Sequence, residues 1–323
     1  MTMVQALNLA LQQEMEKDDG IILLGEDVGV DGGVFRVTDG LFERFGEQRV
    51  LDTPLSENGI VGMSIGMAVY GLKPICEIQF SGFSYQNFHQ IENHAARLRR
   101  RSLGRYHVPM VLRTPYGGGV RALEHHSESR EAFWAHIPGI KMVIPSGPRN
   151  ARGLLVSAIR DPDPVIFYES KALYRAFREE VPEHEETVPI GKPKIVREGK
   201  DLTMISYGAM MRPTLEAAAT LEKKQGVEAE VIDLLTISPL DDEIFIASVL
   251  KTGRAVIVHE APRSFGPGAE IVSRLMEKAF YYLEVPIERV TGYDIIIPLF
   301  SREKAYLPNE QRILRAARKT LEN

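Results

Sequence analysis

Apolar residues along the chain alternate between helical spacing and short continuous runs. Val4, Leu7, Leu11 and Met15 fall on one helical face, with Thr2 expected as the N-cap. Residues 21–24 are apolar without interruption, which is typical of a strand covered on both faces. In the first half this pattern predicts strands at 21–24, 50–51, 74–80, 108–113, 141–144 and 165–168, and helices at 2–17, 57–70, 83–101, 128–136 and 149–159.

The pattern breaks between residues 179 and 200, where glutamates and prolines replace any helical period. We interpret 179–200 as an exposed linker between domains. A second alternating series follows it, with strands predicted at 203–207, 229–233, 255–259 and 287–290, and helices at 213–224, 241–250 and 269–282. Strands separated by helices pair in parallel through right-handed crossovers. The sequence therefore predicts an α/β fold of two mostly parallel-sheet domains, at 1–178 and 201–323.

Composition narrows the class of protein. The chain has 323 residues, of which 44% are hydrophobic and 26% charged, the usual balance of a folded soluble protein. A formal net charge of -5 gives no basic excess for nucleic-acid binding. The chain has one cysteine, Cys76, no apolar run long enough to span a membrane, and no signal peptide at its start. We expect a cytoplasmic protein that binds neither nucleic acid nor membrane.

Two segments at predicted carboxyl ends of strands carry candidate chemistry, because ligands of open parallel sheets bind there. The first is residues 52–57, which lead into a helix that begins at Glu57 behind a Ser56 cap. Glu57 could be a functional carboxylate, or it could only complement the positive end of the helix dipole.

The second segment, residues 116–129, contains three successive glycines and then His125 and His126. A zinc site with His136 is disfavoured, because no cysteine accompanies these histidines and the HExxH spacing is absent. Histidine suits proton transfer near neutral pH. A helix-capping or surface role explains the pair equally well from position alone.

Residues 51–57 have the sequence Leu-Asp-Thr-Pro-Leu-Ser-Glu, which resembles a motif of a known protein family. It is the beta subunit of the thiamine-diphosphate-dependent dehydrogenase component of 2-oxo acid dehydrogenase complexes, of the pyruvate and branched-chain types. The resemblance continues through residues 24–28, 74–80, 117–126, 138–145 and 160–167. It implies a pyrimidine-binding domain followed by a transketolase C-terminal-like domain.

The resemblance also implies site residues. Glu57 matches the glutamate that hydrogen-bonds the aminopyrimidine ring and shares a proton with it, which activates the cofactor carbon. Phe83 matches the aromatic residue packed on the pyrimidine, and Leu55 and Gln79 match cofactor-proximal positions. His126 matches the histidine expected to donate a proton to lipoyl sulfur, whereas His125 has no counterpart in the family.

Many relatives bind a monovalent cation, usually potassium, through oxygens of one segment. The matching residues are Met110, Ala158, Ile159, Asp161 and Asp163. Relatives often carry asparagine at the position of Asp163. Oxygen ligands suit such a hard cation.

The magnesium–diphosphate motif of thiamine enzymes, Gly-Asp-Gly followed by a distant asparagine, is missing. The nearest triplet is Thr38-Asp39-Gly40. The resemblance therefore implies that an alpha subunit supplies Mg²⁺ and the diphosphate half of the site, in an alpha2beta2 heterotetramer. The implied reaction is oxidative decarboxylation of a 2-oxo acid, with transfer of the acyl group to a lipoylated acyltransferase.

Two alternatives remain at this stage. One is half of a transketolase-like or deoxyxylulose-phosphate-synthase-like enzyme, and the other is a non-catalytic scaffold that docks the acyltransferase. The substrate also stays open, because pyruvate and branched-chain acids differ by a few methylenes, worth only about 1–3 kcal/mol.

Overall fold

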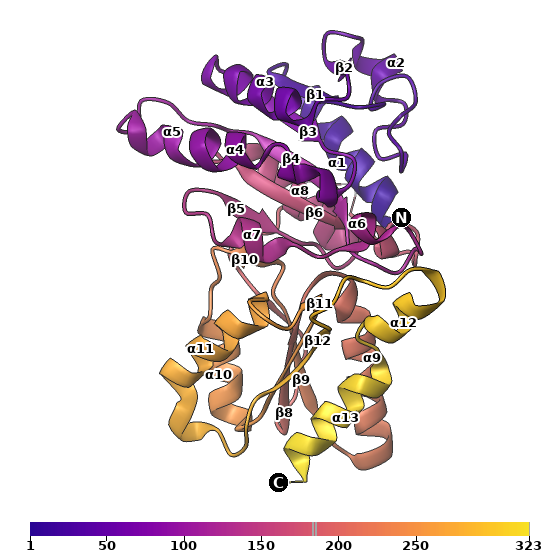
Figure 1. Cartoon of the computed structure of the whole chain (residues 1–323), viewed down its shortest axis with the longest axis vertical. Helices are drawn as coiled ribbons and strands as arrows, with labels where there is room; N and C mark the ends of the chain where they lie inside the picture. The colour runs from indigo at the N-terminus through magenta and orange to yellow at the C-terminus, as the bar shows by residue number, and fades with distance from the viewer. Residues whose placement is uncertain (183, 185, 323) are drawn as a thin grey trace. The chain divides into compact units, whose positions relative to one another are not determined.

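A computed structural model describes residues 1–182, 184 and 186–322 and forms two compact units (Figure 1). The first unit comprises Met1–Tyr116 and Phe133–Ile190. The second comprises Gly117–Ala132 and the chain from Gly191 onward. The short segment 117–132 thus belongs to the C-terminal unit, although the N-terminal unit flanks it on both sides.

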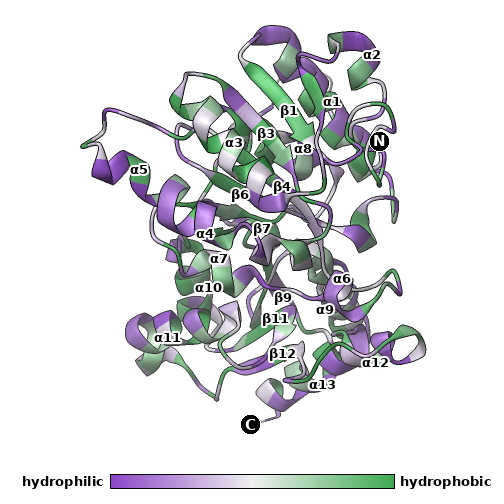
Figure 2. Cartoon of the chain, turned by 45° about the horizontal axis from the view of Figure 1, so that its top comes forward, coloured by the Kyte–Doolittle hydropathy of each residue, from purple (hydrophilic) through white to green (hydrophobic). Residues whose placement is uncertain are grey.

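The first unit contains a parallel sheet. Its strands are β1 (Ile21–Gly25), β2 (Val50–Asp52), β3 (Lys73–Glu77), β4 (Val111–Tyr116), β5 (Lys141–Val143) and β6 (Val165–Ser170). They follow the spatial order β5-β6-β4-β3-β1-β2, and each pair is parallel. Every residue of β1 is buried, and Figure 2 shows this strand as hydrophobic throughout. Burial on both faces explains why β1 reads as a continuous apolar run.

Helices cover this sheet. They are α1 (Met3–Lys17), α2 (Leu41–Phe45), α3 (Glu57–Val69), η1 (Ser81–Tyr85), α4 (Phe88–Gln90), η2 (Ile91–Ala95), α5 (Ala96–Arg101), α8 (Pro148–Arg160) and η3 (Lys171–Leu173). Helix α7 (Glu131–Ala135) spans the boundary between the units. The side chain of Thr2 caps α1 and forms a capping box with Gln5, which confirms the predicted N-cap.

Several predicted elements of the first unit differ in extent from the structure. The strand predicted for 108–113 is β4, at Val111–Tyr116. The strand predicted to reach Phe80 ends at Glu77, and Phe80 adopts a left-handed φ of 73°. The single helix predicted for 83–101 is instead a series of short helical pieces that includes the π-helical turn η2. Such turns are frequent near functional sites, and apolar spacing alone does not reveal them.

The second unit has its own five-stranded sheet in the order β12-β11-β8-β9-β7. Its strands are β7 (Lys194–Arg197), β8 (Leu202–Ser206), β9 (Ala229–Asp233), β11 (Ala255–Pro262) and β12 (Glu288–Gly292); β10 (Thr236–Ser238) follows β9 in sequence. Only β7 runs antiparallel within this sheet.

Helices α9 and α13 cover one face of this sheet, and α10 and α11 cover the other (Figure 1). The helical elements of this unit are α6 (Glu124–Ser127), η4 (Gly208–Met210), α9 (Met211–Gln225), α10 (Glu243–Thr252), α11 (Pro267–Ala279), η5 (Phe280–Tyr282), η6 (Phe300–Arg302), α12 (Glu303–Tyr306) and α13 (Glu310–Leu321). Helix α13 had no counterpart in the sequence prediction, although Ile313, Leu314 and Ala317 lie buried at helical spacing.

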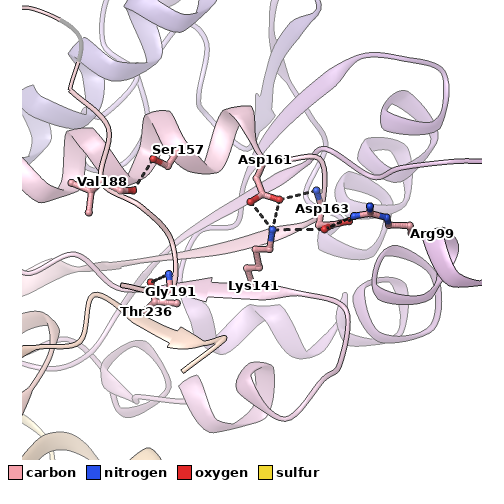
Figure 3. Close-up of polar contacts among 8 residues, drawn as sticks. All are labelled: Arg99, Lys141, Ser157, Asp161, Asp163, Val188, Gly191 and Thr236. Atoms are coloured by element: carbon pink, nitrogen blue, oxygen red, sulfur yellow. Dashed lines mark hydrogen bonds and ion pairs between the residues drawn. The ribbon is translucent and has the colours of Figure 1, made fainter. Parts of the chain in front are cut away.

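The segment predicted as a linker is structured in part. Ser157 of α8 donates a hydrogen bond to the carbonyl oxygen of Val188 at 2.7 Å, and the Gly191 amide donates to Thr236 Oγ1 at 2.9 Å (Figure 3). Residues 194–197 form the edge strand β7, in which Lys194 and Val196 are exposed and Ile195 and Arg197 are half-buried.

The two mostly parallel sheets confirm the predicted α/β fold class. Among the described residues, we find no helix whose length and hydropathy would allow it to span a membrane.

Candidate active site

Glu57 is the first residue of α3, directly after the carboxyl end of β2 and the loop that follows it. Its side chain is only 3% exposed, and its Oε2 has no hydrogen-bond partner among the described residues. Ser56 occupies the N-cap position but makes no side-chain capping bond, so the predicted Ser56 cap is not formed. A buried carboxylate oxygen that lacks a partner requires a hydrogen-bonding group from elsewhere.

Glu26 and Gln79 lie at the ends of neighbouring strands. Burial raises the pKa of Glu26, and the negative charges of Glu57 and Asp27 raise it further. The side-chain amide of Gln79 donates a hydrogen bond to the Glu26 carbonyl oxygen at 2.5 Å. The ends of β1 and β3 and the start of α3 therefore contribute polar side chains to one edge of the first sheet.

Sequence reasoning did not select Glu26 as a site residue. The available signal was its position immediately after the first buried strand, at the same sheet edge as Glu57. Two carboxylates carry like charges that repel one another, so together they favour a bound group that can share a proton with one of them. These residues fit the aminopyrimidine half of thiamine diphosphate, because its ring presents both donors and acceptors.

The aromatic residues after β3 differ in how they pack. Phe80 packs between Phe35 and Phe83, with ring centroids 5.7 and 6.4 Å away, whereas Phe88 packs on Trp134 at 5.4 Å. Phe83 is half-buried. Leu55 is 78% exposed, so little of its apolar side chain is covered by the described residues.

A buried ion network lies beneath this edge. Arg113 on β4 pairs with Glu169 on β6 at 2.7 Å and with Glu77 on β3 at 2.7 Å, and Tyr174 donates to Glu169 at 2.7 Å. Burial raises the pKa of Glu77. Burial alone would lower the pKa of the Arg113 guanidinium. The negative charges of Glu169 and Glu77 have the larger effect, so the net result is a raised pKa. The network links the carboxyl ends of three adjacent strands.

His126 belongs to the second unit, whereas Glu57, Gln79 and Phe83 belong to the first. It lies on α6, a single helical turn in which its amide donates to the Leu123 carbonyl oxygen at 3.0 Å. The rings of His125 and His126 lie 4.0 Å apart, and both side chains are half-buried. Half-burial leaves part of each imidazole exposed at the surface of the second unit.

The predicted cation segment follows α8. Both carboxylate oxygens of Asp161 accept from Lys141 Nζ, at 2.7 and 2.6 Å, and those of Asp163 accept from Arg99 Nη1 at 2.7 Å (Figure 3). The Met110 carbonyl oxygen accepts from the Val165 amide at 3.0 Å. The carboxylates are thus already neutralised. The Ala158 carbonyl oxygen accepts from the Asp161 amide at 3.3 Å, and the last carbonyl groups of α8 lie at the negative end of the helix dipole.

Arginines of α5, and Thr38, also have partners within the chain. Arg97 pairs with Glu92, Arg99 with Asp163, and Arg101 donates to the Asn93 carbonyl oxygen. The described residues contain no group of three or more histidine, cysteine or acidic side chains that could hold a metal ion. Thr38, in the triplet nearest the missing magnesium motif, is buried and donates to the Val28 carbonyl oxygen at 2.7 Å.

Two family models cover nearly the whole chain. The transketolase pyrimidine-binding domain matches residues 1–176, and the transketolase C-terminal domain matches residues 191–313. The fold is similar to a split-gene transketolase, described as an inactive beta4 tetramer, with a TM-score of 0.82, 21% identity, and coverage of 100% of this chain and 98% of that one. The chain is therefore a member of the transketolase-like class of thiamine-diphosphate-dependent enzymes.

Curated relatives narrow this class. The pyruvate dehydrogenase E1 component subunit beta of Acholeplasma laidlawii is 50% identical over 98% of this chain and 97% of its own length. The subunits of the same name from Staphylococcus epidermidis strain RP62A and from Bacillus subtilis are 51% and 50% identical over 100% of this chain and 99% of theirs. The chain belongs to the family of beta subunits of the 2-oxo acid dehydrogenase E1 component.

Proposed function

We propose that this chain acts on pyruvate as the beta subunit of an alpha2beta2 enzyme that decarboxylates it and passes the acetyl group to a lipoylated acyltransferase. The support for pyruvate is the name shared by relatives at about 50% identity over the full chain. The same identity favours this function over a transketolase-like half enzyme, since the likeness to transketolase at 21% identity shows the fold alone.

The observation that carries the proposal is the buried Oε2 of Glu57, which has no hydrogen-bond partner in the described part of the chain. When bound, thiamine diphosphate supplies the carbon nucleophile that attacks the 2-oxo acid and accepts the electrons left by carbon dioxide. Glu57 would hold a proton between its carboxylate and the pyrimidine ring nitrogen. Phe83 would pack on the ring, and Gln79 and Leu55 would line it.

His126 would deliver a proton to the lipoyl sulfur that leaves as the acyl group is transferred. Its half-buried position on a short helical turn supports this role, because a partly exposed imidazole could donate a proton to a group that approaches from solvent. The Ser127 hydroxyl donates to the Leu123 carbonyl oxygen at 3.0 Å and so stabilises the turn.

The alpha subunit would hold Mg²⁺ and the diphosphate, because this chain lacks that motif. We also propose a potassium ion on the carbonyl oxygens at the end of α8, including those of Ala158 and Ile159. Cytoplasmic location is supported by Cys76, a buried cysteine that forms no disulfide.

Calorimetry and a substrate panel test the proposal together. The full chain alone, with magnesium, should bind thiamine diphosphate weakly, whereas the chain assembled with its alpha partner should bind it tightly. The assembled enzyme should release carbon dioxide from pyruvate faster than from branched-chain 2-oxo acids. Tight binding by the chain alone would contradict the split site, and absence of binding by the assembly would favour the scaffold alternative.

A further inference from the structure

The glycine-rich segment before His126 is folded around two carboxylates of the same compact unit. The Gly118 amide donates to Glu260 Oε2 at 3.0 Å. The amides of Gly119 and Arg121 donate to the two oxygens of Glu303, at 2.9 and 3.1 Å. Three backbone donors of one short segment thus converge on two acidic side chains that lie more than 140 residues away in sequence.

The backbone conformation of this segment is what permits these bonds. Gly117, Gly119 and Arg121 have positive φ angles of 80°, 95° and 58°. Alternation of left-handed and ordinary residues directs successive amides toward one side and creates an anion-binding concavity. A Cβ atom at Gly117 would lie 2.5 Å from Glu260 Oε1, so a larger residue there would displace the carboxylate.

Both carboxylates are buried. Glu260, near the end of β11, is 4% exposed, and Glu303, the first residue of α12, is 2% exposed. Arg312 of α13 donates to the Tyr306 and Thr291 carbonyl oxygens at 2.9 and 2.5 Å, which ties α12 to the end of β12. A buried carboxylate that accepts two backbone N–H bonds makes a strong, charge-assisted contact.

The other end of the segment is anchored as well. Tyr207, which follows β8, donates its hydroxyl hydrogen to Glu131 Oε1 at 2.6 Å. Burial raises the pKa of Glu131, while the Tyr207 hydrogen bond opposes that rise. His126 therefore lies between the anchored residues 118–121 and the anchored residue 131, all within the second unit.

We propose that Glu303 and Glu260 are positioning residues for His126: their carboxylates hold the glycine-rich segment in the conformation that presents the imidazole for acyl transfer. This inference rests on the proposed function of His126. Neither glutamate touches the reacting atoms. Their effect passes through the backbone of residues 118–121.

The test uses Glu303→Gln in the full chain assembled with its alpha partner. Glutamine keeps one acceptor oxygen, but its amide group would face a backbone N–H instead of accepting from it. We expect amide exchange in residues 117–126 to accelerate by about tenfold or more. Acyl transfer to lipoamide should fall by about tenfold, while decarboxylation measured with an artificial electron acceptor should change by less than about twofold.

Glu243→Gln is the matched control, because Glu243 also lies in the first turn of a helix in this unit, is exposed, and does not contact the segment. It should change neither exchange nor acyl transfer. Glu303→Asp keeps the charge on a shorter side chain, so the rate of amide exchange in residues 117–126 should lie between those of the unchanged chain and Glu303→Gln. This variant replaces Glu303→Gln in the test if the glutamine variant does not fold.

Unchanged exchange in residues 117–126 of the glutamine variant would overturn the inference, whatever the activity. An equal fall in both half-reactions would also overturn it, because the effect would then be general damage. A third outcome is faster exchange in Glu303→Gln together with full acyl transfer by a separate His126→Ala variant. That outcome would refute the proposed function of His126, and the positioning role with it.

Discussion

Arg113 and Glu169 form a two-pronged ion pair inside the first unit, with Nε to Oε1 at 2.7 Å and Nη2 to Oε2 at 2.9 Å. Each side chain is 1% exposed. The Nη1 group of Arg113 also pairs with Glu77 at 2.7 Å. A buried cation thus holds together two carboxylates that would otherwise lie unpaired in a medium of low dielectric constant.

Arg113→Met should lower the free energy of unfolding by about 3–5 kcal/mol, because Glu169 and Glu77 would lose their counter-ion without leaving the interior. Chemical denaturation of the full chain measures the change. Arg149→Met is the control, since Arg149 pairs with Glu186 at the surface and exposed pairs contribute little. Similar losses in the two variants would refute a special role for the buried network.

His259 makes stability depend on acidity. Burial, together with the charges of Arg289 and Arg263, lowers the pKa of His259 from 6.5 to about 4. The unfolded chain therefore takes up a proton at higher pH than the folded chain. Stability contributed by neutral His259 is complete above pH 6.5 and is lost as the pH falls toward 4, by about 3 kcal/mol in total.

His259→Gln should flatten this part of the curve of unfolding free energy against pH, because glutamine does not titrate there. Its side-chain oxygen could still accept from the Gly268 amide, which donates to His259 Nε2 at 3.2 Å. His136→Gln, at an exposed histidine, should leave the curve unchanged. An unaltered slope in His259→Gln would show that other groups control acid unfolding.

Glu57→Gln should reduce decarboxylation by the assembled enzyme at least about a hundredfold, because glutamine keeps a hydrogen bond but cannot exchange a proton with the ring. Carbon dioxide release and subunit assembly are measured on the same preparation. Glu43→Gln is the control, since Glu43 also lies in the first turn of a helix in this unit. Nearly normal turnover by Glu57→Gln would leave Glu57 only as a complement to the helix dipole.

His126→Ala should separate the two half-reactions. Acyl transfer to lipoamide should fall by about 10²–10⁴-fold, the usual contribution of a general acid, and decarboxylation with an artificial acceptor should fall much less. His125→Ala controls for damage to the shared helical turn, because the two rings lie 4.0 Å apart. Equal loss of acyl transfer in both variants would assign the turn a structural role.

The sequence predicted most of the regular elements because burial imposes a period on them. Strands such as β1 and helices such as α1 closely match their predicted extents. The pieces between Ser81 and Arg101 were not predictable in this way, since the shift from one helical type to another leaves the apolar spacing almost unchanged. The edge strand β7 was missed because half of its side chains face solvent.

The candidate site also contains some residues that the sequence could indicate and others that it could not. Glu57 could be selected because it follows a predicted strand at one sheet edge. Gln79 was selected only through the family resemblance, because it lies inside the strand predicted for residues 74–80. Glu303 and Glu260 could not be selected, since they act from distant parts of the chain on backbone amides, and no spacing in the sequence records that contact. The Lys141 and Arg99 partners of Asp161 and Asp163 were equally hidden, and they leave main-chain oxygens as the proposed cation ligands.

The membership of residues 117–132 in the second unit has a consequence for dividing the molecule. The polypeptide passes between the units after Tyr116, after Ala132 and after Ile190, so no single cut yields both units complete. A fragment ending near residue 178 would carry the histidine segment without Glu260, Glu303 and Tyr207. A fragment beginning near residue 191 would retain those three side chains without the backbone they hold. The turn that carries His126 therefore depends on residues from the whole chain. If two relatives exchanged their C-terminal domains, this turn would be held by the carboxylates of the other relative instead of by Glu260 and Glu303.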